Sequence, residues 1–234
     1  MPPKKSKTPQ QVQGGMAFFA SYLVLLALSC VSVKVLIIVL LNSTLGHLLF
    51  PTIGVILGWW AGYTLFRGQP SVLLHEYKHA ILATLIGNKW KKLKLDGMSG
   101  AFHYTYTKDT AEYNAFISLA PYFLPVLTLL GLLLYAIVSY HSLEGAIIIT
   151  TAFHGAEIYF NLKDASPIQT DLTDIRGGYY SALGYIAVSN TFITSMLFIW
   201  IIGGPDGLQL WLDGLWGLGV LLVAAVRAGL IPSS

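Results

Sequence analysis

Long apolar runs, separated by two polar segments, dominate this chain of 234 residues. Residues 16–66 are apolar for about 50 positions, with one clear turn at Asn42, Ser43 and Thr44, and this length is enough for two membrane spans of ~20 residues each. Further apolar runs cover residues 112–140, 143–160, 179–202 and 208–231. The pattern predicts an all-α polytopic membrane protein with about six to eight transmembrane helices.

Two prolines interrupt the apolar run at residues 112–140. Pro121 and Pro125 stand in the stretch Ser118-Leu119-Ala120-Pro121-Tyr122-Phe123-Leu124-Pro125. Prolines at this position predict a kinked or broken helix, which a membrane bundle tolerates where neighbouring helices satisfy the backbone.

The first polar segment follows Gly87 and predicts a small β-hairpin. Lysine and leucine alternate at residues 92–95, a glycine-rich turn follows, and Phe102, Tyr104 and Tyr106 then alternate with polar residues. Two interpretations stay open. The hairpin is either a structural ribbon or a sheet edge to which an extended peptide adds as a strand.

Composition indicates an integral, multi-pass membrane protein. Hydrophobic residues make up 55% of the chain and charged residues 11%, well below the ~25% typical of soluble domains. Much of the net charge of +3 is local, and this arrangement is typical of membrane-flanking charge, not of a nucleic-acid surface. The lysines concerned are Lys4, Lys5, Lys7, Lys89, Lys91, Lys92 and Lys94. The single cysteine, Cys30, excludes a disulfide framework and a cysteine-based metal site.

These features divide the chain into four parts. Residues 1–15 are expected to be a disordered basic tail, and residues 16–68 to form the N-terminal transmembrane helices. Residues 69–180 carry the candidate chemistry, and residues 181–234 form C-terminal transmembrane helices. Orientation stays open, because two full spans followed by a full third helix would place Lys89 to Lys94 outside, against the positive-inside tendency.

The chemistry centres on His75-Glu76-Tyr77-Lys78-His79, an HExxH motif inside an apolar helical run. At about 100° per residue, the two histidines fall about 40° apart on one face, so both imidazoles can bind one ion. In the usual chemistry of this motif, Zn2+ takes the two histidines and one further protein ligand, and the adjacent glutamate is the general base. Ionisable groups in so apolar a run are costly unless they pair, bind metal or line a wet cavity. Lys78 is expected to reach an interface or the site cavity.

The third metal ligand is sought among the acids of the second polar segment, residues 161–178. Asp171 is the first choice because it follows Pro167 at the mouth of an apolar helix. Asp174 and Asp164 are the alternatives in the same segment. His154 and Glu157, three residues apart on one helix, are further candidates, although a structural pair between them is slightly preferred.

In these residues the chain resembles the site-2 protease family of intramembrane zinc metalloproteases. His75, Glu76 and His79 match the first family motif, Ser118 to Pro121 resembles the small-residue and proline stretch of the helix between the two motifs, and the hairpin resembles the family's short sheet. The resemblance covers residues 70–180. It departs at the second motif, because Asp171 is followed by Leu172 where the family has Asp-Gly.

The resemblance implies a zinc metalloendopeptidase that hydrolyses a peptide bond in or near the transmembrane segment of another membrane protein. Its expected metal ligands are His75, His79 and Asp171, and its expected general base is Glu76. The expected partners are a membrane-protein substrate and the lipid bilayer, not a nucleic acid. A non-proteolytic membrane scaffold or accessory subunit is the alternative, and a metal or solute transporter is a third hypothesis.

Overall fold

The computed structural model describes residues 15–65, 68–97 and 99–228, so the disorder expected of the N-terminal tail concerns residues almost wholly outside this part. The described part of the chain is mostly helical, with 78% of the described residues in helices, and contains a two-stranded antiparallel sheet. The elements are α1 (Met16–Leu41), α2 (Leu45–Thr64), α3 (Gln69–Leu85), β1 (Lys89–Asp96), β2 (Ser99–Thr105), a 3-10 turn (Ala111–Tyr113), α4 (Asn114–Phe123), α5 (Val126–Val138), α6 (Leu143–Lys163), α7 (Thr170–Thr173) and α8 (Gly178–Arg227).

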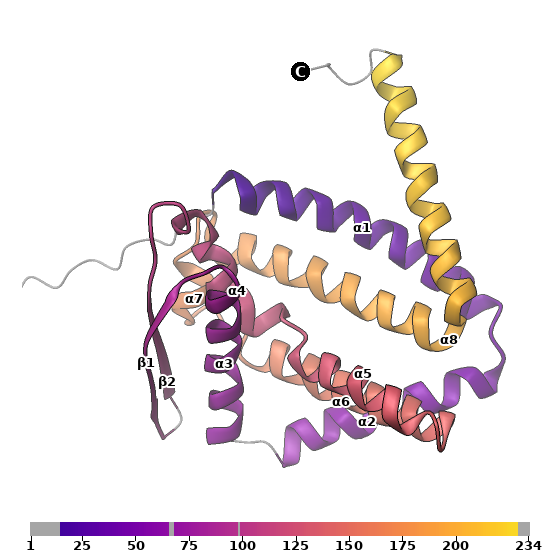
Figure 1. Ribbon diagram of the computed structural model, residues 1–234, viewed down its shortest axis with the longest axis horizontal. Helices are drawn as coiled ribbons and strands as arrows, with labels where there is room; N and C mark the ends of the chain where they lie inside the picture. The colour runs from indigo at the N-terminus through magenta and orange to yellow at the C-terminus, as the bar shows by residue number, and fades with distance from the viewer. Residues whose placement is uncertain (1–14, 66–67, 98, 229–234) are drawn as a thin grey trace, which may run out of the picture.

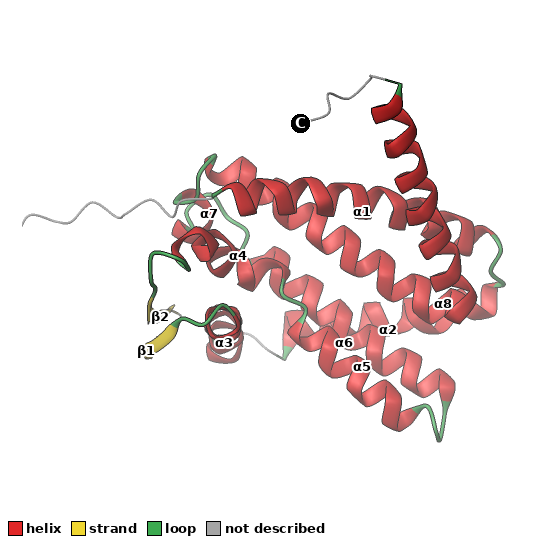
Figure 2. Ribbon diagram, turned by 45° about the horizontal axis from the view of Figure 1, so that its top comes forward, coloured by secondary structure: helices red, strands yellow, loops and turns green. Residues whose placement is uncertain are grey.

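The helices form layers that are closed at one end by the elements of the candidate site. Helix α1 packs against the first part of α8, and α2 and α5 pack against α6. Helix α3 and the hairpin run crosswise to α1 and α8 at one end of the molecule, and α4 and α7 lie at the same end (Figures 1 and 2). The HExxH motif therefore lies on a helix that crosses the end of the long helices.

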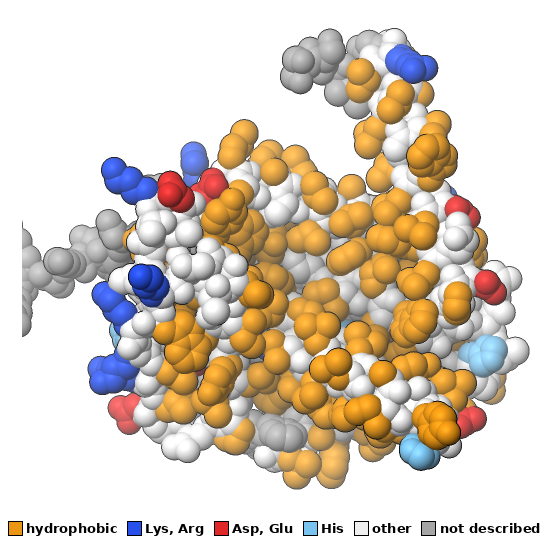
Figure 3. Space-filling model, in the orientation of Figure 1, with side chains coloured by type: hydrophobic (Ala, Val, Ile, Leu, Met, Phe, Trp, Pro, Cys, Tyr) orange, Lys and Arg blue, Asp and Glu red, His pale blue; other side chains and the backbone are white. Residues whose placement is uncertain are grey.

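Within the described residues, three helices, α1, α2 and α8, are long and apolar enough to cross a membrane. The segment Ala111–Phe123 and α5 pass the same test as a pair bent by 60°, which would make a fourth span. The prediction of a mostly helical chain with membrane-compatible helices and a small hairpin is confirmed, whereas the count of six to eight spans is not. Figure 3 shows hydrophobic side chains covering most of one face, while lysine and arginine side chains gather at the hairpin end.

Two of the predicted interruptions lie where the pattern placed them. Asn42 follows the last residue of α1, and α2 begins three residues later. The proline stretch breaks the run at residues 112–140 into α4 and α5, with Leu124 in an extended conformation between them. Residues 179–202 and 208–227 of the last two apolar runs belong to one helix, α8, which bends at Gly204, where φ is 55°.

Helices α2 and α6 approach each other through glycines. Gly54 and Gly58 on α2 face Thr151 and Ala152 of α6, and Gly155 on α6 faces the backbone of Val55. A Cβ atom added at Gly58 would lie far inside van der Waals contact with the Ala152 carbonyl. This glycine seam, Gly54, Gly58 and Gly155, lets the two backbones touch, as small residues do in membrane helix pairs.

We expect Gly58→Val to lower the free energy of unfolding by about 3 kcal/mol, because the added side chain must push apart two backbones instead of a flexible side chain. Thermal unfolding of the protein in detergent measures the effect. Gly219→Ala on α8 is the matched control, since a Cβ there meets nothing within 4 Å. An equal midpoint for Gly58→Val and the control would contradict the close packing.

Candidate metal centre

Helix α3 holds the two histidines of the HExxH motif on one face. Pro70 stands in its first turn, where a missing N–H costs no helical hydrogen bond. The helix ends at Leu85, and Gly87, with a φ of 89°, turns the chain toward β1. Because His75 and His79 are one turn apart, their ring centroids lie 5.0 Å from each other, and both rings face the loop that leads to α7.

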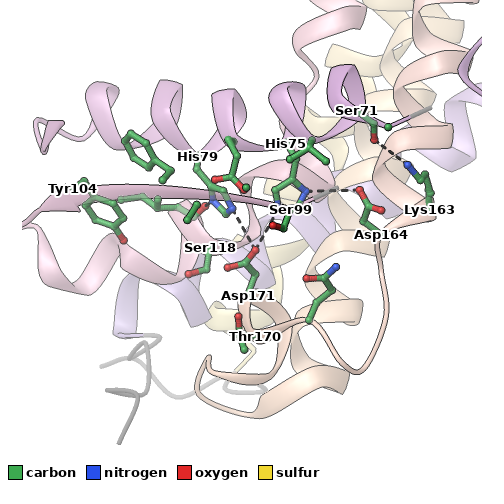
Figure 4. Close-up of a pocket in the computed structure, with 18 residues that line it drawn as sticks. Ser71, His75, His79, Ser99, Tyr104, Ser118, Lys163, Asp164, Thr170 and Asp171 are labelled. Atoms are coloured by element: carbon green, nitrogen blue, oxygen red, sulfur yellow. Dashed lines mark hydrogen bonds and ion pairs between the residues drawn. The ribbon is translucent and has the colours of Figure 1, made fainter. Parts of the chain in front are cut away.

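Asp171 in the single turn of α7 completes a group of three possible metal ligands. Its Oδ2 atom lies 3.3 Å from Nε2 of His75 and 3.3 Å from Nε2 of His79 (Figure 4). One ligand atom from each residue lies within 4.8 Å of the others. A tetrahedral ion bound at ~2.0–2.1 Å separates its ligands by roughly 3.3 Å, so two imidazole nitrogens and one carboxylate oxygen fit a zinc ion.

Each imidazole faces Asp171 with its Nε2 atom and has a second neighbour at its Nδ1 atom. His79 Nδ1 lies 2.6 Å from the carbonyl oxygen of Ile117 on α4, and since a carbonyl only accepts, Nδ1 is the protonated nitrogen. With Nδ1 bound to this carbonyl, Nε2 is the nitrogen that faces Asp171, and a metal ion bound there would replace its proton. His75 Nδ1 lies 3.9 Å from Asp164 Oδ2, and the ring of Tyr122 packs edge-on against His75 at a centroid distance of 5.4 Å.

Charge favours the ionised form of Asp171. Burial alone would raise the pKa of this carboxyl, but hydrogen bonds from His75 and His79 and their positive charge outweigh it and hold its pKa well below its usual range. Burial, with Tyr106 and Asp171 nearby, raises the pKa of Tyr104 to about 12. The site therefore presents an anionic oxygen beside a neutral phenol at neutral pH.

Glu76 lies beside the histidines and against strand β2. Its side chain is buried and accepts a hydrogen bond from the backbone N–H of Phe102. Gly100 leaves the space that Glu76 occupies, since a Cβ there would lie 2.6 Å from Glu76 Cγ and 2.7 Å from Oε1. The hairpin thus fixes this carboxylate next to the metal ligands but outside the group of three.

A partly open cavity of about 510 Å³ surrounds these groups. It is lined by α3, by residues 99–102 and Tyr104 of β2, by α4 and by the loop before α7. Ser118, Lys163 and Thr170 also face it (Figure 4). The cavity gives access to both Glu76 and Asp171.

The other candidate ligands take different positions. Asp164 lines the cavity near His75, whereas Asp174 accepts a hydrogen bond from Thr173 and does not line it. His154 and Glu157 lie away from the two histidines. They do not form the structural pair that was preferred, because His154 contacts Thr128 and Thr194 through its ring nitrogens.

Lys78 is not where the sequence placed it. The expectation that it reaches an interface or the site cavity is wrong, because its side chain is 1% exposed and forms an ion pair with Glu157 on α6. It also donates hydrogen bonds to Asn161 Oδ1 at 2.7 Å and to the Pro121 carbonyl at 3.1 Å. The cation is therefore turned away from the metal ligands.

Three contributors to the site were not singled out from the sequence: the Ile117 carbonyl, the tyrosine at position 104 as a cavity residue, and Gly100. The alternation of Phe102 and Tyr104 gave a signal that these two share a face of the hairpin. Which face meets α3 depends on packing between segments and carries no local signal.

Comparisons with known protein families, with curated proteins and with solved structures find no match to this chain.

We expect Asp171→Ala to lose zinc, because it removes the one carboxylate within ligand distance of both imidazoles. Zinc per protein molecule, measured by elemental analysis after purification in detergent, gives the result. Asp174→Ala is the matched control and should keep the wild-type stoichiometry. Full zinc content in Asp171→Ala and loss in Asp174→Ala would reassign the third ligand.

Proposed function

We propose that this protein is a zinc-dependent endopeptidase that cleaves membrane proteins, as its resemblance to site-2 proteases implies. The observation that carries the proposal is that Asp171 Oδ2 lies 3.3 Å from Nε2 of both His75 and His79, with Glu76 beside them. Structural zinc sites use four protein ligands, whereas catalytic sites keep one position open. The three donors and the adjoining cavity support a catalytic site.

The residues of this chain account for peptide hydrolysis in simple steps. Zinc held by the three ligands would polarise the scissile carbonyl and activate a water molecule. Glu76 takes the proton of the attacking water and returns it to the leaving amine. The Phe102 N–H and the gap at Gly100 hold the carboxylate in place, and the Ile117 carbonyl keeps His79 in the required tautomer.

The position of the hairpin is the observation that favours a substrate bound in an extended conformation. Strand β2 pairs with β1 on one edge only, and its residues 99–102 and Tyr104 line the cavity beside Glu76. Of the two interpretations left open by the sequence, the edge position favours strand addition, in which a peptide pairs with β2 and brings its backbone past Glu76. A helical substrate must unwind locally to bind in this way.

The membrane-protein substrate is supported by the place of the site. Helix α3 and the hairpin lie across one end of helices long enough to span a bilayer (Figure 1). A multi-pass arrangement, with α4 and α5 as one bent span and α8 as two segments, would put the cavity close to a membrane surface. We therefore propose cleavage near the end of a substrate's transmembrane segment.

A non-proteolytic scaffold is the alternative, suggested by Lys78 inside the motif and by the absence of Asp-Gly at residues 171 and 172. Lys78 points away from the ligands, and Leu172 is buried in the core that Phe18 and Tyr185 share. Neither residue alters the donor set. Only a cleavage assay separates the two functions, because both would bind zinc.

We expect Glu76→Gln to bind zinc at wild-type stoichiometry and to lose at least 100-fold in cleavage rate, because an amide cannot accept the proton of water. The assay uses a library of transmembrane peptides in liposomes, with products read by mass spectrometry. Glu144→Gln, at an exposed position on α6, is the control and should cleave normally. A Glu76→Gln protein as active as wild type would refute the mechanism, and zinc-loaded wild type without any product would favour the scaffold.

A further inference from the structure

The two prolines at the end of α4 leave two backbone carbonyls without a helical partner. In an α-helix the carbonyl of one residue accepts from the N–H four residues later. Proline has no N–H, so Pro121 leaves the Ile117 carbonyl free and Pro125 leaves the Pro121 carbonyl free. A buried carbonyl without a donor is costly, and both need a donor from elsewhere.

Helix α3 supplies both donors from adjacent residues of the HExxH motif. His79 Nδ1 donates to the Ile117 carbonyl at 2.6 Å, and Lys78 Nζ donates to the Pro121 carbonyl at 3.1 Å. Adjacent residues are about 100° apart around a helix, so two such contacts fix its rotation about its own axis, which one contact could not do. The same rotation points His75 and His79 at Asp171.

A buried polar network fixes the other side of Lys78. Lys78 pairs with Glu157, whose side chain is 2% exposed. Glu157 in turn accepts the backbone N–H groups of Leu127 and Thr128 at the start of α5. Lys78 and Glu157 thus bind backbone groups on both sides of the break between α4 and α5. Lys78 contacts the α4 side directly and the α5 side through Glu157.

We propose that Pro121 and Pro125 set the rotation of the metal-binding helix by leaving the carbonyls that His79 and Lys78 bind, so that Lys78 is a positioning residue for the metal ligands. The simpler view is that the prolines only bend the chain. The proposal rests on the metal site of the proposed function, but not on peptide hydrolysis.

The test compares helix stability with zinc affinity. Pro121→Ala gives the Ile117 carbonyl a helical N–H, which competes with His79, so the helix gains a hydrogen bond while zinc binding weakens. We expect the Kd for zinc, measured against a competing chelator, to rise about 10- to 100-fold, as when a residue that orients a ligand is lost. The absorption bands of the cobalt-substituted protein should change as well. Pro51→Ala inside α2 is the matched control and should leave Kd and cobalt bands unchanged.

A second variant keeps the test decisive if Pro121→Ala fails to fold. Lys78→Met/Glu157→Gln removes both buried charges and keeps an acceptor for the N–H groups of α5. We expect it to fold and to bind zinc at least 10-fold more weakly. Zinc affinity within twofold of wild type and unchanged cobalt bands, in either folded variant, would overturn the proposal.

A readout without metal separates this proposal from the proposed function. Ser71 lies two turns before Lys78 on the same face of α3 and is buried, so Ser71→Cys, in a Cys30→Ser background, reports the rotation of the helix. Alkylation of this cysteine by a maleimide should be at least fivefold faster with Lys78→Met/Glu157→Gln. Absence of zinc from wild type would refute the metal site, while an unchanged alkylation rate would refute the positioning role.

Discussion

The buried ion pair between Lys78 and Glu157 is the interaction on which the arrangement of the site depends. Two charges removed from water cost several kcal/mol each unless partners satisfy every polar atom. Here the partners are backbone groups freed by the break between α4 and α5, together with Asn161. The same contacts therefore give the two buried charges their hydrogen-bond partners and give the backbone groups at the helix break theirs. One buried network therefore joins α3, α4, α5 and α6.

The metal centre is built on this framework from parts of different rigidity. The two histidines stand on a helix fixed against α4, whereas Asp171 comes from a single helical turn between loops. Glu76 is held by a strand instead of by a helix. An ion bound at this site would therefore tie the loop that carries Asp171 to the framework, and the Glu76 carboxylate would stay independent of it.

Local patterns predicted the local features of this chain. The spacing of His75 and His79, the period of the hairpin and the effect of Pro121 on its helix each depend on residues within one turn or one strand, and the structure has them as expected. The sequence favours Asp171 over Asp174 only by its position after Pro167. That packing brings Asp171 to the two histidines and leaves Asp174 outside the cavity carries no local signal. The predicted position of Lys78 is wrong for the same reason, because its partner Glu157 lies on a helix that is distant in the chain. The number of spans depends on whether a break such as Gly204 separates two helices or bends a single one, and the hydrophobic periodicity does not distinguish these cases.

The glycine seam between α2 and α6 has a mechanical consequence for access to the cavity. Backbones in direct contact cannot slide or tilt without losing many close atomic contacts at once, so α6 and the charged pair anchored to it behave as a fixed wall. The hairpin, in contrast, is a two-stranded ribbon with mostly exposed residues on β1. An outward displacement of the ribbon would therefore cost fewer contacts than a displacement of α6, and it would also move the strand that holds Glu76.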